Sequence, residues 1–486
     1  MYNGVKCYFT FTVLPFGLHS SPYVFTKCVK PLVAHWRALG LKIVVYLDDG
    51  ICAVKNLDEG RRAANIVKSD LLRAGLVPNV EKSVWEPTVE LKWLGILWNF
   101  KEGILKIPDE KLCNLKNTLH IVISKLTSIS AIELARLTGL IISFTPCIGN
   151  ITRLMTRFLY SEIDKASTWD VRLNLGNNCD IVRELNFWLE NIDSFNGTKK
   201  FRDITLPKDI LGYSDASSFA AGGYIVHSTI NFAQEWCHKT WTNEEREKSS
   251  TWREMRACWF ALASYSKFLK GKQVKWFSDN KNLVSIIEKG SKKLDLQTIA
   301  LDIYQLQVLF DIKLEVEWIP REENQLADYI SKIHDYDDWE VSDDFFYFMD
   351  GLFGPVTVDR FASLNTRKTS RYNSKFWDPY CEAVDAFTQN WSSENDWLVP
   401  PIYLISRCIR HLKGCKGQGT LIAPEWKSSS FWADLVEFGG VFKSGVLDVL
   451  RFPRSNCNIF KSGLHTSVFG TSKLHSAILA IRLDFS

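Results

Sequence analysis

Hydrophobic and polar positions divide the chain into stretches of different periodicity. Residues 1–110 alternate short apolar runs, such as LKIVVYL at 41–47, with a helical stretch from Glu59 to Leu72, which predicts a mixed α/β region. Residues 111–200 carry apolar positions at helical spacing and predict several packed helices. Strand-like runs return from Ile210 to Asp279, around a long helix that starts near Thr251. The pattern favours an α/β multidomain protein with a helical section between two mixed regions.

Beyond these regions the pattern changes at an acidic stretch. Residues 335–350 carry seven acidic and no basic side chains, which predicts a boundary, although the aromatic residues there indicate that part of the stretch docks on a neighbouring domain. A block that contains Trp and Pro follows to about residue 440, and residues 441–486 are predicted to be a C-terminal tail.

Composition narrows the class of protein. The 486 residues are 46% apolar and 23% charged, which excludes a disordered or fibrous chain and leaves room for about three domains. The net charge of +4 permits nucleic-acid binding without requiring it. The twelve cysteines have no zinc-knuckle spacing, and no stretch of about 18 residues stays apolar. We therefore expect an intracellular protein with reduced thiols and no membrane contact.

An apolar run that ends in two adjacent carboxylates forms the first candidate site. The sequence LKIVVYLDDG at 41–50 predicts a strand, a tight turn around Asp48 and Asp49, and a return strand. Adjacent carboxylates repel each other, and a divalent cation with oxygen ligands relieves this repulsion. Taken alone, such a tripeptide is more often a solvated turn than a metal site.

The motif YLDD at 46–49 resembles the catalytic signature of reverse transcriptases, and three further segments resemble that family in the same order. These segments are LPFGLHSSPYVF at 14–25, AGLVPNVEKS at 74–83 and LKWLGI at 91–96. The resemblance implies a palm over residues 1–110 and a helical thumb and connection over 111–204. It assigns a two-metal polymerase site to Asp48 and Asp49. It also assigns nucleotide and template contacts to Pro15, Phe16, Gly17 and Lys82, and a primer grip to Trp93, Leu94 and Gly95.

One acidic residue expected from this resemblance is missing. The family has a third metal-binding aspartate upstream of the segment that starts here at Tyr2, whereas residues 1–13 contain no Asp or Glu. We therefore expect an amino-terminally truncated palm without fingers. Its incomplete metal site is predicted to support little or no DNA synthesis.

Four acidic residues in the second half form a more complete set. Asp215 ends an apolar strand in GYSDAS, and Glu254 lies on a predicted helix. Asp279 ends the strand VKWFSDN, and Asp328 lies early in the helix of NQLADYISK. Carboxylates beside strand ends and helix starts can converge on one sheet edge, where such a cluster needs cations. Each acid alone is better explained as a helix cap or an exposed charge.

The order of these four acids resembles ribonuclease H over about residues 207–333. The resemblance implies a ribonuclease H-like α/β domain over 205–335. In it, two Mg²⁺ ions, with Mn²⁺ as the alternative, bind the four acids and activate water against the RNA of an RNA·DNA hybrid. Many family members carry a histidine shortly before the last aspartate, whereas IPREEN at 319–324 has none. This difference is expected to affect turnover more than metal binding.

Lysines are concentrated next to these acids in the sequence. Residues 267–293 carry eight lysines against two acids. Because the run lies beside the predicted nuclease site, we predict that Lys270, Lys272 and Lys275 contact the nucleic-acid backbone. A solvated helix face is the alternative.

The block at 353–426 resembles the adenine methyltransferase-like region that follows ribonuclease H in DIRS-type retrotransposons. Active relatives place Asn or Asp before a Pro-Pro-aromatic run, whereas here Val399 precedes two prolines and an isoleucine. Valine cannot accept a hydrogen bond from an adenine amino group. We therefore expect a methyltransferase-like α/β domain over 351–440 that does not use S-adenosylmethionine, even if Asp359 could hold a cofactor hydroxyl.

Together, these resemblances predict a DIRS-like retroelement polyprotein fragment that acts on primer-template nucleic acid and on RNA·DNA hybrids. Its best-supported predicted activity is cleavage of the RNA strand of a hybrid. The predicted boundaries leave residues 336–350 as an acidic linker and 441–486 as a tail. One alternative is a non-catalytic nucleic-acid-binding remnant, and another is a fragment that does not fold alone. The oligomeric state is not predicted.

Overall fold

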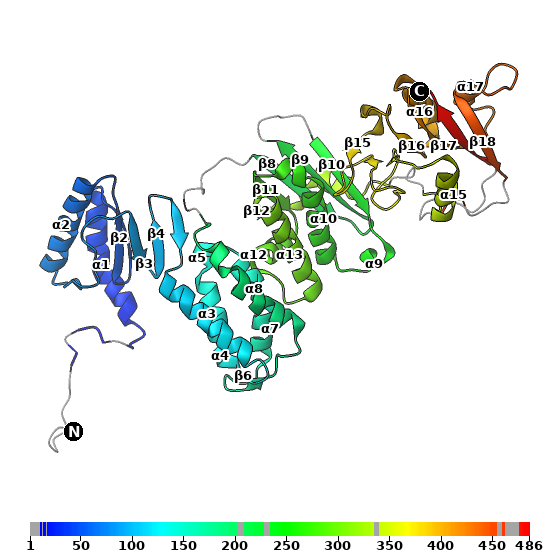
Figure 1. Ribbon diagram of the computed structural model, residues 1–486. Helices are drawn as coiled ribbons and strands as arrows, with labels where there is room; N and C mark the ends of the chain where they lie inside the picture. The colour runs from blue at the N-terminus through cyan, green and yellow to red at the C-terminus, as the bar shows by residue number, and fades with distance from the viewer. Residues whose placement is uncertain are drawn as a thin grey trace. The chain divides into compact units, whose positions relative to one another are not determined.

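The chain forms two compact units, residues 1–205 and 206–486 (Figure 1). The structure is a computed structural model that describes residues 10–11, 13–15, 17–199, 201, 209–227, 234–334, 340–453, 459–461 and 476–486. No helix among the residues described is both long and apolar enough to cross a membrane.

The first part of unit 1 combines two helices with two small antiparallel sheets. Its elements are α1 (Ser21–Ala38), β1 (Lys42–Tyr46), β2 (Asp49–Ala53), α2 (Leu57–Arg73), β3 (Glu90–Trp93), β4 (Ile96–Asn99) and β5 (Ile104–Lys106). Strands β1 and β2 form a hairpin, and β3, β4 and β5 form a separate sheet. Helices α1 and α2 pack on the hairpin, where Ile43 is buried while Val44 and Tyr46 are exposed. The hairpin therefore has one covered face.

The second part of unit 1 is helical, as the periodicity predicts. Its elements are α3 (Asp109–Ser124), β6 (Ile129–Ser130), α4 (Ala131–Ser143), α5 (Thr145–Ile148), α6 (Ile151–Leu154), α7 (Arg157–Lys165), β7 (Arg172–Leu173) and α8 (Cys179–Phe195). Ser130 and Glu133 form a capping box that starts α4. Leu134, Leu137 and Ile141 then follow at helical spacing and are fully buried. Their shared face fixes α4 in the core.

Unit 2 begins with a five-stranded sheet covered by helices. Its elements are β8 (Ile210–Ala216), β9 (Ala220–His227), β10 (Gln234–Thr240), α9 (Asn243–Arg246), α10 (Ser250–Ser264), α11 (Ser266–Leu269), β11 (Gln273–Ser278), α12 (Lys281–Lys289), α13 (Leu294–Leu309), β12 (Lys313–Trp318), η2 (Arg321–Glu323) and α14 (Gln325–Ile330). The strand order is β10-β9-β8-β11-β12. Strand β9 runs antiparallel to both β8 and β10, whereas β11 runs parallel to both β8 and β12.

Two adjacent glycines in β9 let helices approach both faces of this sheet. A Cβ atom on Gly222 would lie 2.3 Å from the backbone nitrogen of Ser331, which directly follows α14. A Cβ atom on Gly223 would lie 3.0 Å from the Cβ atom of Ala261 in α10. Successive strand residues face opposite sides of a sheet, so α14 and α10 cover opposite faces.

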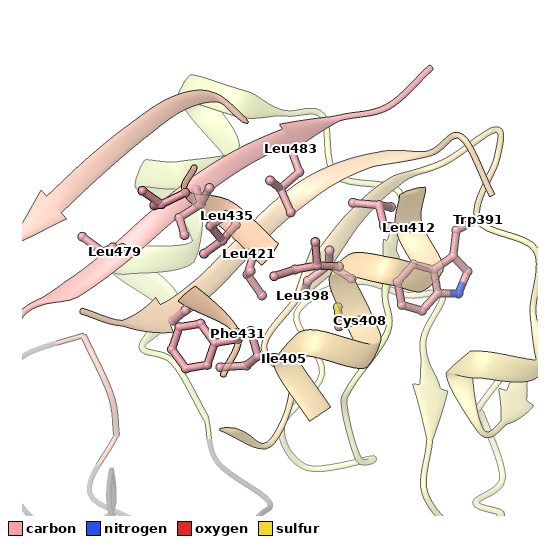
Figure 2. Packing of buried hydrophobic residues seen from close by; sticks show 14 of the residues in the cluster. Trp391, Leu398, Ile405, Cys408, Leu412, Leu421, Phe431, Leu435, Leu479 and Leu483 are labelled. Carbon is pink, nitrogen blue, oxygen red and sulfur yellow. The ribbon is translucent and has the colours of Figure 1, made fainter. Parts of the chain in front are cut away.

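The rest of unit 2 contains a second five-stranded sheet. Its elements are α15 (Asp343–Phe353), β13 (Val358–Asp359), β14 (Asn373–Ser374), β15 (Ala383–Val384), η3 (Ala386–Thr388), β16 (Asn395–Leu398), η4 (Ile402–Leu404), α16 (Ile405–Gly414), β17 (Gln418–Pro424), α17 (Trp432–Leu435), β18 (Val446–Phe452) and β19 (Ile478–Asp484). The strand order is β13-β16-β17-β19-β18. Leu398 and Leu421 pack with α16 in the core shown in Figure 2, whereas the neighbouring Trp397 and Ile422 pack with α15.

Two segments predicted to lie outside this domain belong to its core. The predicted acidic linker, 336–350, contains most of α15, whose Phe345, Phe346 and Met349 are buried. The predicted tail, 441–486, supplies β18 and β19, and β19 pairs with both β17 and β18. Both predictions are therefore wrong for these segments, because acidic residues mark only the exposed face of α15 and strand pairing over long sequence distances leaves no local pattern.

The segment between β14 and β15 contacts the edge strand β10 of the first sheet. The backbone amide of Trp377 donates to the carbonyl of Trp236 at 2.9 Å, and Cys237 forms an isolated parallel bridge with Trp377. The Trp377 indole donates to Glu235 Oε2 at 2.5 Å, and its ring lies 5.1 Å from the ring of Phe268. Residues of the C-terminal domain therefore cover part of an edge that would otherwise be open.

Candidate metal centre

Three of the four predicted carboxylates of unit 2 lie together at one sheet edge. Asp215 lies near the end of β8, and Asp279 directly follows β11. Because these strands are parallel neighbours, their carboxyl ends lie at the same edge. Glu254 reaches this edge from α10, which packs on β8 and β9. One carboxylate oxygen from each residue lies within 4.8 Å of the other two.

Glu254 is buried, at 8% exposure, and its Oε2 atom accepts no hydrogen bond. Burial raises the pKa of its carboxyl well above the ordinary value, and the charges of Asp215 and Asp279 raise it further. A buried carboxylate oxygen that lacks a donor and lies beside two other carboxylates carries a free-energy cost that a cation removes. The three residues therefore fit a divalent ion that prefers oxygen ligands.

Asp215 is oriented by a hydroxyl group. Its Oδ2 atom lies 2.6 Å from the Oγ atom of Ser331, which donates a hydrogen bond. Burial raises the pKa of Asp215, and this hydrogen bond partly opposes the increase. Burial also raises the pKa of Asp279, which the nearby charge of Arg321 partly opposes. The group thus holds its negative charges at a cost in the absence of an ion.

Asp328, the fourth predicted ligand, is not a member of this three-carboxylate group. Its Oδ1 atom accepts a hydrogen bond from Arg321 Nη2 at 2.7 Å, and its Oδ2 atom accepts one from Lys332 Nζ at 2.5 Å. Partial burial would raise the pKa of Asp328, but these two hydrogen bonds lower it below the ordinary value. The structure therefore brings together three of the four acids and pairs the fourth with two cations.

The partners of these acids were not singled out from the sequence. Ser331 and Lys332 follow Asp328 by three and four residues, so their spacing along a helical turn was an available signal. Arg321 precedes Asp328 by seven residues and lies in η2, outside the helix. No sequence periodicity relates Arg321 to Asp328, because the contact depends on how the intervening turn folds.

The predicted lysine contacts divide into two groups along β11. Lys270 and Lys272 precede the first residue of β11, whereas Asp279 follows its last residue. Six strand residues at about 3.3 Å each place these two ends roughly 20 Å apart. Lys270 and Lys272 therefore lie apart from the carboxylates, and their contact with the nucleic-acid backbone stays a prediction. Lys275 lies within β11 and pairs with Glu317 at 2.5 Å.

Lys281 is linked to the acids through an aromatic side chain. Its Nζ atom lies 4.3 Å from the ring centroid of Trp318, and the Trp318 indole donates to the backbone carbonyl of Asp279 at 2.9 Å. The Trp318 residue is 40% exposed. A cation and an accessible aromatic ring therefore adjoin the carboxylate group.

Asp48 and Asp49 lie on the β1–β2 hairpin. Tyr46 pairs with Asp49, so Leu47 and Asp48 form a two-residue turn in which Leu47 has a φ of 54°. Both aspartates are exposed. Within the part of the chain that the structure describes, no third metal-binding side chain joins them in a group. Their role as polymerase ligands stays a hypothesis.

The predicted template- and nucleotide-contacting residues lie on either side of the hairpin in sequence. Gly17 has a φ of 82°, and the carbonyl of Pro15 accepts a hydrogen bond from the Ser21 hydroxyl at 2.8 Å. Phe16 lies outside the described residues. Lys82 is exposed in the segment after α2. Nothing in these contacts tests a role in nucleotide binding.

The predicted primer grip forms the β3–β4 turn. Trp93 pairs with Ile96, and Leu94 and Gly95 between them have φ values of 48° and 73°. Two successive positive φ values are typical of the tight turn that suits an antiparallel hairpin. The turn is thus defined, and its contact with a primer stays a prediction.

The predicted cofactor residue of the C-terminal domain is buried, and the hollow beside Val399 is apolar. Asp359 is 3% exposed, and its Oδ2 atom accepts a hydrogen bond from the backbone amide of Lys368 at 3.1 Å. Val399 lines a small hollow with Pro400, Ile402 and other apolar side chains. This hollow offers no side-chain acceptor to an adenine amino group.

Two segments of the chain match reverse-transcriptase family models. Residues 2–97 match the reverse transcriptase (RNA-dependent DNA polymerase) family, and residues 220–334 match a family described as reverse transcriptase-like. The first segment includes Asp48 and Asp49, and the second includes Glu254, Asp279 and Asp328. The two segments expected to be reverse transcriptase and ribonuclease H-like thus match reverse-transcriptase family models in the expected order. No curated protein matches the chain.

Several solved structures resemble parts of the chain. A foamy viral protease-reverse transcriptase in complex with double-stranded DNA is 19% identical, with a TM-score of 0.35, and the match covers 63% of this chain and 50% of that one. A ribonuclease H1 from the archaeon Halobacterium salinarum is 19% identical, with a TM-score of 0.21 and coverage of 25% and 92%. LC11 ribonuclease H1 in complex with an RNA/DNA hybrid is 20% identical, with a TM-score of 0.22 and coverage of 25% and 92%. The chain spans about half the length of the foamy viral protein.

Proposed function

We propose that the chain is a metal-dependent ribonuclease H that hydrolyses the RNA strand of RNA·DNA hybrids. The observation that carries this proposal is the convergence of Asp215, Glu254 and Asp279, with ligand oxygens within 4.8 Å of one another and one buried Glu254 oxygen without a donor. The match of residues 220–334 to the reverse transcriptase-like family supports it.

The roles of the residues follow from their positions. Divalent ions bound at such a site lower the pKa of water and neutralise charge on a phosphate. Asp215 and Asp279 would hold an ion from adjacent strand ends, and Glu254 would do so from α10. Ser331 fixes the orientation of Asp215 through its 2.6 Å hydrogen bond. Hydrolysis forms a bond between the water oxygen and phosphorus, breaks the bond from phosphorus to the leaving ribose oxygen, and transfers a proton to that oxygen.

Cleavage of a labelled hybrid by the full-length protein tests this function. The unaltered protein with Mg²⁺ is expected to cut the RNA strand of the hybrid and to leave double-stranded RNA and DNA intact. Asp279→Asn should lower the rate by about 100-fold or more, because a bound metal contributes several kcal/mol to such reactions. Asp295→Asn, at an exposed acid near the start of α13, is the matched control. Equal rates for the Asp279→Asn and unaltered proteins would contradict the proposal.

A second candidate function is non-catalytic binding of nucleic acid by a remnant of such an enzyme. The engagement of both Asp328 oxygens by Arg321 and Lys332 favours it, because the fourth acid is then not free for an ion. A folded protein that binds hybrids with the usual salt dependence but does not cleave them with Mg²⁺ or Mn²⁺ would support this candidate.

We propose also that DNA synthesis by this chain is weak or absent. Asp48 and Asp49 have no third carboxylate partner among the described residues. The order of the segments supports assignment to a DIRS-like retroelement, whose methyltransferase-like domain here would be a structural module. Nucleotide incorporation on a primed template by the purified protein would overturn the expectation of weak synthesis.

A further inference from the structure

Asp328 differs from the other three acids of the candidate metal centre in its partners. Both of its carboxylate oxygens accept hydrogen bonds from cations, at 2.7 Å from Arg321 and 2.5 Å from Lys332. The other three acids have oxygens within 4.8 Å of one another. The three-carboxylate group thus adjoins a fourth carboxylate whose charge is balanced by two cationic side chains.

Hydrogen bonds from residues on both sides of Arg321 hold its turn near these acids. The backbone amide of Ile319 donates to the carbonyl of Ser278, at the end of β11, at 3.0 Å. The side chain of Asn324 donates to the carbonyl of Ser214 on β8, also at 3.0 Å. Asn324 is fully buried, so this second anchor is shielded from water. The turn that carries Arg321 is thus tied to the two strands that position Asp215 and Asp279.

The contact of Arg321 with Asp328 is nevertheless exchangeable. The Arg321 side chain is 68% exposed, and exposed ion pairs contribute little to stability. The hydrogen bond to Asp328 raises the pKa of Arg321, and the charges of Asp328, Asp215 and Asp279 raise it further. The guanidinium group therefore lies in the same negative field that would attract a divalent ion.

On the basis of the proposed function, we propose that Arg321 is a positioning residue that takes the place of a second divalent ion. A first ion binds to Asp215, Glu254 and Asp279. A second ion binds when Asp328 exchanges Arg321 for the ion, so this exchange sets the affinity of the second site.

Calorimetric titration of the full-length protein with Mn²⁺, without nucleic acid, tests this proposal. Arg321→Gln should tighten binding of the second, weaker ion by roughly two- to fivefold, because the ion then replaces no exposed ion pair. The first ion should be affected less. Arg321→Lys keeps the positive charge and should behave more like the unaltered protein. Arg451→Gln, which removes an exposed pair with Glu425 in the other sheet, is the matched control.

The outcomes separate this proposal from the proposed function. If two ions bind and Arg321→Gln leaves the second unchanged or weakens it, Arg321 does not compete with an ion and only the present inference fails. If the unaltered protein and Arg321→Gln both bind a single ion, the inference fails in the same way. If the unaltered protein binds no ion, or if Asp279→Asn binds the first ion normally, the proposed nuclease function itself fails.

Discussion

Glu254 places an ionisable carboxyl where burial and two neighbouring carboxylates disfavour its charged form. The side chain is 8% exposed, one of its oxygens has no donor, and Asp215 and Asp279 lie beside it. Residues that bind ions commonly oppose stability in this way. Replacement of this carboxyl should therefore stabilise the metal-free protein and reduce the stabilisation that a divalent ion provides.

Glu254→Gln is expected to raise the free energy of unfolding by about 1 kcal/mol in the absence of divalent ions, because it removes an acid whose charged form is disfavoured by burial and by two neighbouring carboxylates. With Mg²⁺ the order should reverse, since only the unaltered protein gains the full energy of ion binding. Thermal unfolding with a chelator and with Mg²⁺ measures both effects. Glu247→Gln, at an exposed site, is the control. A loss of stability of Glu254→Gln in the chelator would contradict this account.

Glu184 gives unit 1 a dependence on pH. Burial raises its pKa to about 7, although its hydrogen bonds to the amides of Phe158 and Leu159 oppose the increase. The folded pKa lies above the unfolded value of 4.5, so the folded state binds the proton more tightly. The contribution of Glu184 to stability is therefore most favourable below about pH 4.5 and falls as pH rises towards 7, by up to ~1.4 kcal/mol per pH unit.

Glu184→Gln should remove this fall. Hydrogen-exchange protection of α7 and α8, corrected for intrinsic exchange rates and compared at pH 5 and pH 7, measures it. The unaltered protein should lose protection at pH 7, and Glu184→Gln should not. Glu190→Gln, at an exposed position on the same helix, should keep the fall. An equal pH response of both variants would show that another group is responsible.

The acids of the candidate metal centre could be predicted as a set, but their partners could not. Asp215 and Asp279 end apolar strands, and this pattern is visible in the sequence. The pairing of Asp328 with Arg321 depends on a turn outside any helix or strand, so periodicity gives no indication of it. Lys270 and Lys272 lie at the opposite end of β11 from Asp279, so the local density of charge was no measure of their distance from the carboxylates.

Helix α15 shows why the acidic composition of residues 336–350 misplaced a domain boundary. Ser342 caps α15, and Asp343 pairs with Lys368 and Lys461. Phe345, Phe346 and Met349 on the same helix are buried. Acidic side chains near a helix start suit the helix dipole as well as they suit a linker. The apolar positions, rather than the charges, determine that α15 belongs to the domain.

Trp377→Ala should expose the covered part of β10. The indole contacts Glu235 and Phe268, and the backbone amide of residue 377 pairs with Trp236. Loss of the ring is expected to destabilise this edge by about 1–3 kcal/mol and to lower hydrogen-exchange protection of β10. Trp169→Ala, at a residue that is 60% exposed in unit 1, should leave β10 unchanged. Unchanged protection in Trp377→Ala would show that the contact is not needed.

At the scale of the whole molecule, the C-terminal sheet depends on pairing between distant segments. Strand β19 lies between β17 and β18, and its residues Leu479, Ala480 and Ile481 are buried. More than fifty residues separate the end of β17 from the start of β19 in the sequence. Local patterns do not reveal such pairing, and the segment was for this reason predicted to be a tail.

Deletion of residues 441–486 should therefore unfold the C-terminal domain rather than shorten it. The deletion removes β18 and β19 and leaves β17 as an open, apolar edge. Limited proteolysis should cut the truncated protein throughout residues 340–440, whereas the full-length protein should resist. A stable fragment over 340–440 in the truncated protein would contradict the central role of β19.

The close approach of α14 to β9 depends on the absence of a side chain at Gly222. A single methyl group there would collide with the backbone of Ser331 and push the end of α14 away from β9. Ser331 orients Asp215, and Asp328 lies on the same short helix. A descendant of this chain could thus keep all four acids and still lose the geometry that makes them useful. A substitution at Gly222 alone could therefore abolish activity, and a comparison of the charged residues would not detect the loss.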